Sequence, residues 1–213
     1  MDNELTIWDY FKSPLYLIEK DEWVDDVNTV CDSYILEQKL ISKNNPNYLK
    51  EHEHSYQSSN LINESKLNDL KFYILKTSHN ILDSQGYDLT NYNLYFEDMW
   101  VQEFSEKGKG HHNSHVHSES HISGFYFLKC SDKTSYPVFT DPRSAAVVTS
   151  LPQKNKSNIT YSTRDFNYQP KPGTMIFFNS YLPHQFNVDD GLDPFRFIHF
   201  NIQAVPKEIL KHD

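Results

Sequence analysis

The second half of the chain places the strongest limit on its fold. From residue 91 onward, apolar and polar residues alternate in short segments that are separated by Gly, Pro, Asn and Asp. A period of two is typical of β-strands, which are expected at 93–104, 114–117, 122–129, 136–140, 174–179, 184–188 and 195–205. Because no helical segment separates these strands, they predict an antiparallel sandwich or barrel.

The first 90 residues follow a helical period instead. Apolar residues recur at helical spacing in 21–41 and in 65–82, and the polar stretch 42–61 between them is expected to be a loop. Ser65 or Asn63 is placed to cap the second helix. The residues expected to face the core are Trp23, Val27, Val30, Tyr34 and Leu40 in the first helix and Leu67, Leu70, Ile74 and Ile81 in the second.

Together these patterns predict an α+β, mainly β fold. We expect a double-stranded β-helix (jelly roll) over 91–205, covered by a helical layer from 1–90, in a single domain of 1–213. The segment 140–173 interrupts the strands with a long excursion. Such a loop is often a lid or a binding loop, although it could simply cover a sheet edge.

The charge and composition narrow the class of ligand. The formal charge is −9 and the 20 Lys and Arg residues are scattered, so nucleic acid is not an expected partner. No run approaches the roughly 18 to 20 apolar residues of a membrane span, and the first residues lack a signal-peptide pattern. We expect a cytoplasmic protein of a bacterium or a phage-infected host, with Cys31 and Cys130 as buried free thiols.

Histidines are concentrated in the stretch HHNSHVHSESH, residues 111 to 121, which holds five of the eleven in the chain. His115 and His117 are one residue apart, so in an extended segment they project to the same side and can bind one metal ion. His184, in a later strand, is the candidate for the third ligand. The alternative is a polar surface loop.

The remaining histidines are not expected to be ligands. Those in the same stretch are predicted bystanders: His111, His112 and His121. Four others lack ligand spacing and are expected to be ordinary surface or core residues: His52, His54, His79 and His199.

Arg196 is the second unusual feature of the strand region. In FRFIHFNI, alternation places it on the same face as Ile198, Phe200 and Ile202, which are apolar. A guanidinium on an inward face keeps its charge and must meet an anion. The anion is either a carboxylate ligand held in the same cavity as the metal or an internal Asp or Glu.

From Trp100 through Ile202 the chain resembles the jelly-roll dioxygenases that use Fe(II) and 2-oxoglutarate, and more narrowly a family of oxygenases from marine bacteria and their phages. The resemblance is carried by an ordered series of motifs: MWVQEF, SHVHSESHISGFYFL, TDPR, KPGTMIFFNSYLPH and FRFIHFNI. The helical N-terminal portion also fits this family, so the resemblance covers nearly the whole chain.

The resemblance implies roles for named residues. His115, His117 and His184 would hold iron, and Arg196 would receive the far carboxylate of 2-oxoglutarate. The wider superfamily has Asp or Glu where this chain has His117, forming a triad of two histidines and one carboxylate. Three histidines are therefore preferred here, with Asp141 as the alternative third ligand.

Residues on the neighbouring predicted strands complete the expected site. Tyr126 and Asn201 are predicted to line the cosubstrate pocket, and Trp100, Gln102 and Arg143 the substrate side, with ordinary core packing or a surface turn as the alternative. The implied reaction releases succinate and carbon dioxide and oxidises a C–H bond of a small-molecule or peptide substrate.

Other functions remain open for the same histidines. A zinc hydrolase would use all three, and a non-catalytic cupin-like module or a phage scaffold would use the barrel alone. An exposed edge strand could pair two copies into a homodimer.

Overall fold

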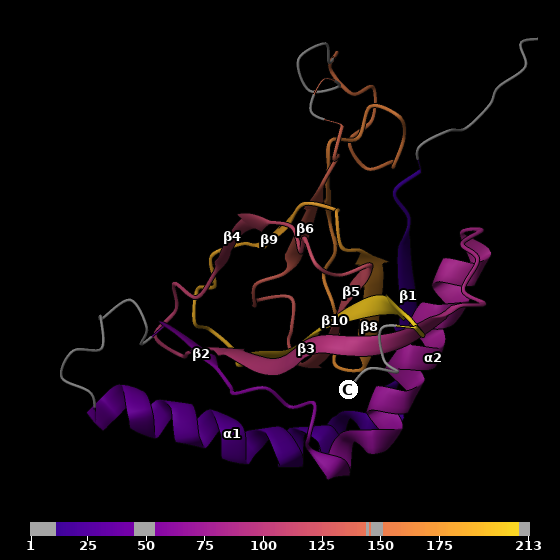
Figure 1. Ribbon diagram of the computed structural model, residues 1–213. Coiled ribbons are helices and arrows are strands. Elements are labelled where there is room, and N and C mark those ends of the chain that lie inside the picture. Colours follow the sequence, from indigo (N-terminus) through magenta and orange to yellow (C-terminus); the bar gives the residue numbers. More distant parts are fainter. Residues whose placement is uncertain (1–11, 45–53, 144, 146–150, 209–213) are drawn as a thin grey trace, which may run out of the picture.

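The computed structural model describes residues 12–44, 54–143, 145 and 151–208, which form two antiparallel sheets and two main helices (Figure 1). The larger sheet has the order β1 (Leu15–Glu19), β8 (Thr174–Asn179), β5 (Ile122–Lys129), β10 (Phe195–Pro206), β3 (Tyr92–Phe104) and β2 (Ser55–Gln57). The smaller sheet has the order β4 (His112–His115), β9 (His184–Phe186), β6 (Pro137–Thr140) and β7 (Asp165–Asn167). This arrangement confirms the predicted jelly roll.

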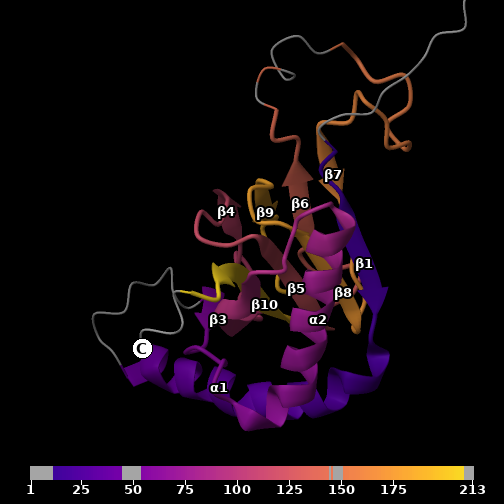
Figure 2. The ribbon, with the colours of Figure 1, turned by 45° about the vertical axis from the view of Figure 1, so that its right-hand side comes forward.

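The helices α1 (Val24–Asn44) and α2 (Asn68–Ser84) confirm the predicted helical segments, and each is preceded by a 3-10 turn, Asp21–Trp23 and Ser65–Leu67. Figures 1 and 2 show both helices against the larger sheet, on the side away from β4, β9 and β6. The cap of the second 3-10 turn is Glu64, whose side chain accepts from the Lys66 N–H, and not Ser65 or Asn63. None of the described helices is long and apolar enough to span a membrane.

Two apolar clusters lie on opposite faces of the larger sheet. The first lies between the helices and the larger sheet, and it includes Val27 of α1, Ile74 of α2 and Ile198 of β10. The second fills the space between the two sheets, and its buried members are Phe104, Phe125, Phe127, Phe139, Ile176, Phe178, Leu182, Phe186, Phe195 and Phe197. The alternation of β10 therefore sends Phe197 between the sheets and Ile198 toward the helices.

Several local expectations were wrong. β1, β2 and β7 were not predicted, because they are short and two of them are largely polar strands at sheet edges. Leu40 on α1 is exposed, since the buried stripe of this helix runs through Val27, Cys31 and Ile35. The strand expected at 184–188 ends at Phe186, and Val188 beyond it is exposed. Both cysteines are free thiols, of which Cys31 is buried and Cys130 is partly buried.

Candidate metal centre

Three histidines meet where β4 pairs with β9. The antiparallel register puts His115 directly opposite His184, and their ring centroids are 4.4 Å apart. His117 lies just beyond β4, where its backbone N–H donates to the Ser180 carbonyl at 3.0 Å. One nitrogen from each ring lies within 4.8 Å of one from the other two. Strand pairing thus joins the HxH pair to a histidine almost 70 residues away.

Two of the three rings have the tautomer that metal binding requires. His115 Nδ1 lies 2.7 Å from the Asn113 carbonyl and His184 Nδ1 lies 2.9 Å from the Leu182 carbonyl. A carbonyl can only accept, so each Nδ1 carries the proton and each Nε2 keeps its lone pair. The His184 Nε2 is buried and has no partner among the described residues.

Burial also keeps two of the three rings neutral. It lowers the pKa of His184 to about 3, even though the Leu182 carbonyl acts in the opposite direction. It lowers the pKa of His117 to about 4, with a smaller contribution from neighbouring histidines. Neutral imidazoles are the form that binds a metal ion.

His117 is held from behind by Asn201. The Asn201 Nδ2 lies 3.3 Å from His117 Nδ1 and also donates to Asp98, while its Oδ1 accepts from Ser123. The oxygen and nitrogen of an amide are exchanged by a 180° turn. In the turned orientation Oδ1 accepts from His117 Nδ1–H, which frees Nε2 for a metal ion. Oδ1 then also faces Asp98, so this orientation requires a protonated Asp98 carboxyl that donates to it, and burial raises the pKa of that carboxyl. Asn201 therefore lies beside a predicted ligand, and its place in the cosubstrate pocket stays a prediction.

Asp141 does not join this cluster. Its carboxylate is bound on both oxygens by Arg143, at 3.0 and 2.7 Å, and the metal-type cluster among the described residues contains only the three histidines. Arg143 lowers the pKa of the Asp141 carboxyl below its usual value. The alternative of Asp141 as third ligand is therefore wrong. Asp141 pairs with Arg143 two residues away instead.

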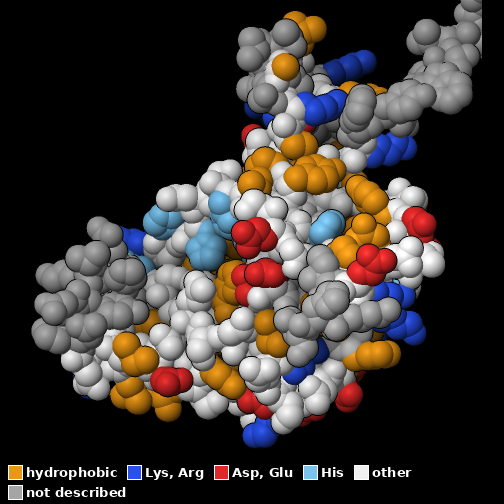
Figure 3. Space-filling model, in the orientation of Figure 1, with side chains coloured by type: hydrophobic (Ala, Val, Ile, Leu, Met, Phe, Trp, Pro, Cys, Tyr) orange, Lys and Arg blue, Asp and Glu red, His pale blue; other side chains and the backbone are white. Residues whose placement is uncertain are grey.

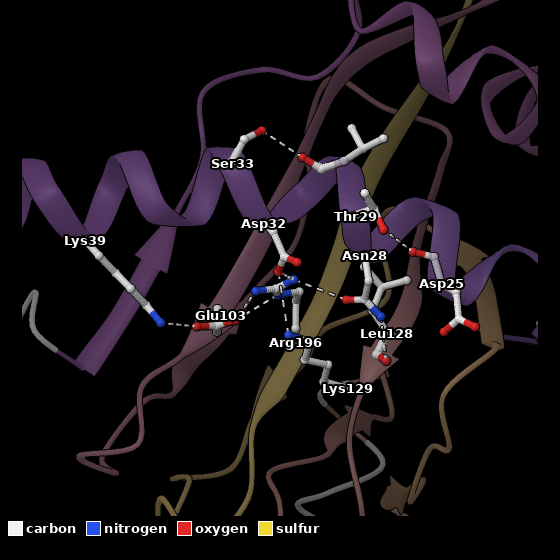
Figure 4. Close-up of polar contacts among 11 residues, drawn as sticks. Asp25, Asn28, Thr29, Asp32, Ser33, Lys39, Glu103, Leu128, Lys129 and Arg196 are labelled. Atoms are coloured by element: carbon white, nitrogen blue, oxygen red, sulfur yellow. Dashed lines mark hydrogen bonds and ion pairs between the residues drawn. The ribbon is translucent and has the colours of Figure 1, made fainter.

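Arg196 faces away from the histidines. Its guanidinium donates to Glu103 at 2.6 and 2.7 Å and to Asp32 of α1 at 2.6 Å (Figure 4). Asn28 accepts from it as well, and Lys39 binds the other Glu103 oxygen at 2.7 Å. Burial opposes its charge, but Glu103 and Asp32 outweigh that effect and raise the guanidinium pKa. Placing Arg196 in the metal cavity was wrong, because its face of β10 packs on the helices.

Tyr126 is on that same outer face. It is fully buried among the apolar residues beneath the helices, and its hydroxyl donates to the Lys20 carbonyl at 2.6 Å. Its expected place in the cosubstrate pocket is therefore contradicted. The parity of β5 explains the error, since Phe125 and Phe127 are the residues of this segment that point between the sheets.

Trp100 and Gln102 do point between the sheets. The Trp100 ring stacks on His199, with centroids 4.4 Å apart. Gln102 is buried and its side-chain amide donates to the Ser55 hydroxyl, but its Oε1 has no partner among the residues described. Neither residue contacts the histidine cluster through a hydrogen bond that the structure shows.

His199 is a site residue that the sequence analysis missed. It is buried, its ring centroid lies 4.8 Å from that of His117, and burial lowers its pKa well below the usual value. It shares the inward parity of Phe197 and Asn201. Reading FRFIHFNI in the opposite register, with Phe197, His199 and Asn201 inward, would have found it.

Part of the histidine cluster reaches the surface, because His115 and His117 are only partly buried. In Figure 3 pale blue side chains gather on one face, over β4 and the segment after it. A separate cavity of about 760 Å³ lies where β1, β6 and β7 meet the excursion, and Arg143, Tyr161 and Arg164 line it. Its lining includes Leu182 and Phe139, whose neighbour is His184: the Phe139 and His184 rings are 6.3 Å apart.

Solved structures share this architecture at low sequence identity. A prolyl-4-hydroxylase from Pseudomonas putida matches 88% of this chain and 91% of its own, with 10% identity and a TM-score of 0.56. AviO1 from Streptomyces viridochromogenes matches 90% of each chain, with 7% identity and a TM-score of 0.58. A viral collagen prolyl hydroxylase from Paramecium bursaria Chlorella virus-1, in its 2OG complex, matches 90% of this chain and 96% of its own, with 15% identity and a TM-score of 0.50.

Sequence comparison gives the family. No curated protein matches the chain with significant similarity. Residues 98–200, which include all three clustered histidines and their supporting strands, match the model of the family described as "Putative 2OG-Fe(II) oxygenase". Within the jelly-roll core, residues 98–200 therefore match the 2OG-Fe(II) oxygenase family, whose cofactors are Fe(II) and 2-oxoglutarate.

Proposed function

We propose that His115, His117 and His184 hold Fe(II) as three neutral imidazoles and that the enzyme hydroxylates a C–H bond of a small-molecule or peptide substrate, releasing succinate and carbon dioxide. The observation that supports this most directly is the convergence of three ring nitrogens within 4.8 Å. Imidazole is a suitable ligand for iron, and three ligands on one side leave positions for the cosubstrate and for dioxygen.

The residues around the centre fit this task. The Asn113 and Leu182 carbonyls fix the rings of His115 and His184, so these two ligands are oriented before the metal binds. The iron and its cosubstrate supply the oxidation chemistry. The protein orients them and excludes water. The phenylalanines between the sheets, of which Phe125 contacts the His184 ring, form the apolar side of the site.

The substrate is proposed to approach from the side of the excursion. The cavity there borders His184 through Leu182 and Phe139. It is lined mainly by apolar side chains, together with Arg164 and the paired Asp141 and Arg143. A long loop beside such a cavity is a suitable binding loop or lid. The protein's place in the cytoplasm and the pairing of edge strands into a homodimer stay predictions.

Zinc hydrolysis is the function that most needs to be separated from this one. Three neutral imidazoles also suit Zn²⁺. Arg196 does not distinguish the two functions, because it pairs with Glu103 and Asp32 and not with a bound carboxylate. The three histidines support a metal site, and the family match favours iron with 2-oxoglutarate over zinc at that site. Metal analysis distinguishes the two.

The test is anaerobic binding of Fe(II) and 2-oxoglutarate. We expect a weak visible charge-transfer band when both are present, and succinate release after oxygen is admitted. His184→Ala should abolish the band, whereas His111→Ala, in the same histidine-rich stretch but outside the cluster, should leave it unchanged. Zinc-dependent ester hydrolysis that is indifferent to 2-oxoglutarate would contradict the proposal.

A further inference from the structure

His199 is buried beside the proposed metal ligands without satisfying its own hydrogen bonds. It is 2% exposed, and neither ring nitrogen has a partner among the described residues. The Trp100 indole N–H, on the ring stacked against it, is also buried and unpartnered. Each such group costs roughly 1–3 kcal/mol. The unpartnered His199 and Trp100 side chains lie next to each other and next to a metal site, which indicates a ligand that hydrogen-bonds to both residues.

Among the described residues, no lysine or arginine is buried on the inner side of the larger sheet. Arg196 is the only Lys or Arg that is buried in the part of the chain that the structure describes, and its charge is matched by Glu103 and Asp32 beneath α1. The side chains around His199 are aromatic instead. The Phe125 ring centroid lies 5.1 Å from that of His199, and Phe197 packs against Phe125. A carboxylate there must be held by neutral donors and by the metal.

We propose that His199 and Trp100 donate hydrogen bonds to a carboxylate of 2-oxoglutarate, so that this chain binds its cosubstrate through an imidazole, an indole and the metal ion instead of a guanidinium. The inference rests on the proposed function. A neutral imidazole donates from one nitrogen and an indole from Nε1, which gives two donors. Hydrogen bonds to an ionised acceptor are roughly twice as strong as those between neutral groups.

With neutral donors in place of a guanidinium, 2-oxoglutarate binding should depend on the metal ion. The metal ion would be the only positive charge near the carboxylate, so 2-oxoglutarate should bind to the Fe(II) form and not measurably to the metal-free protein. The strength of binding should also depend on His199 without a matching change in the affinity for Fe(II).

The experiment is anaerobic calorimetric titration of the full chain, first with Fe(II) and then with 2-oxoglutarate. His199→Phe keeps the ring shape and removes both nitrogens, and should weaken 2-oxoglutarate binding roughly 10- to 100-fold. Its affinity for Fe(II) should stay within about threefold. His199→Gln, which keeps a donor, should recover part of the loss, and Trp100→Phe should cause a smaller one.

The control is the double variant Arg196→Gln with Glu103→Gln, which should bind 2-oxoglutarate within about threefold of the wild type. If His199→Phe does not fold, Trp100→Phe decides the question at a half-buried position. Unchanged 2-oxoglutarate binding in the His199 and Trp100 variants would overturn the inference and leave the oxygenase proposal standing. A wild-type Fe(II) form that does not bind 2-oxoglutarate would contradict both.

Discussion

Arg196 and His199 lie three residues apart on β10 and point into opposite layers of the protein. On the helical side, Arg196 pairs with Glu103 and Asp32, and Lys39 pairs with the second Glu103 oxygen. On the inner side, both nitrogens of His199 lack a hydrogen-bond partner among the residues that the structure describes. A buried charge with all its partners present needs no further explanation and is costly only when one partner is removed. A buried polar group without partners does need one, and beside a metal site a ligand can supply the missing hydrogen bonds. The contrast separates a structural residue from a candidate functional one on the same strand.

The largest expected effect is on the Arg196 side. Arg196→Met leaves Glu103 buried without its main partner and should lower the free energy of unfolding by about 3 to 5 kcal/mol. Urea denaturation measures this change. Removing both charges, in Arg196→Met with Glu103→Leu, should recover most of the stability. If Arg196→Met instead lost iron affinity at unchanged stability, Arg196 would belong to the metal side after all.

Replacing Asn201 tests the orientation of His117. Asn201→Leu removes the acceptor behind the ring and should weaken metal binding roughly 10- to 100-fold. Asn201→Asp keeps an acceptor at the same place and should bind within a few-fold of the wild type. Titration with Co²⁺ gives both affinities. Equal affinities in all three proteins would show that Asn201 does not orient the ligand.

The pH dependence of the metal-free protein tests the buried histidines together. The folded pKa of His184 is about 3, so the unfolded chain takes up protons first, near its pKa of roughly 6.5. Stability is therefore complete above about pH 7 and falls as the pH drops toward the folded value. Between pH 7 and 5, His184 alone should lower the free energy of unfolding by about 2 kcal/mol.

Thermal or urea unfolding between pH 7 and 5 measures this slope. His112, whose pKa burial lowers to about 4, packs between Phe104 and Phe186 outside the metal cluster. His112→Phe should flatten part of the slope while metal affinity is unchanged. A metal-free protein equally stable at pH 5 and pH 7 would contradict the neutral burial of these rings.

The smallest effect is expected at Asp141. Its partner Arg143 is half-exposed, and exposed ion pairs contribute about 0 to 1 kcal/mol. Asp141→Asn should therefore change the stability by less than about 1 kcal/mol and leave metal affinity unchanged. A large loss of metal binding in this variant would restore Asp141 as a ligand.

Much of the architecture could be predicted from local patterns. The helices around Val27 and Ile74 followed from periodicity, because each buries one regular face. The long strands Tyr92–Phe104 and Phe195–Pro206 followed from runs rich in aromatic and β-branched residues between turn residues. The short edge strands could not be predicted, because strands as short as Ser55–Gln57 show almost no alternation and depend on the neighbour with which they pair. Boundaries such as the end of β9 depend on that pairing as well.

The candidate site divides in the same way. The HxH spacing and the position of His184 on a strand were sufficient to bring the three histidines together as a hypothesis. The partners of Arg196 and the place of His199 were not, because β10 is apolar on both faces and alternation cannot tell which face meets the helices. A one-residue change of parity exchanges the two sets of side chains.

The sequence by itself determined the jelly-roll class, the helical layer and the pairing of a neighbouring HxH with a distant histidine, since these depend on periodicity and on the chemistry of imidazole. Only the tertiary structure decided that Arg196 belongs to the helical layer and His199 to the metal side. The physical reason is that the register of β10 against β3 and β5, together with the packing of α1 on one face, assigns each side chain to its layer.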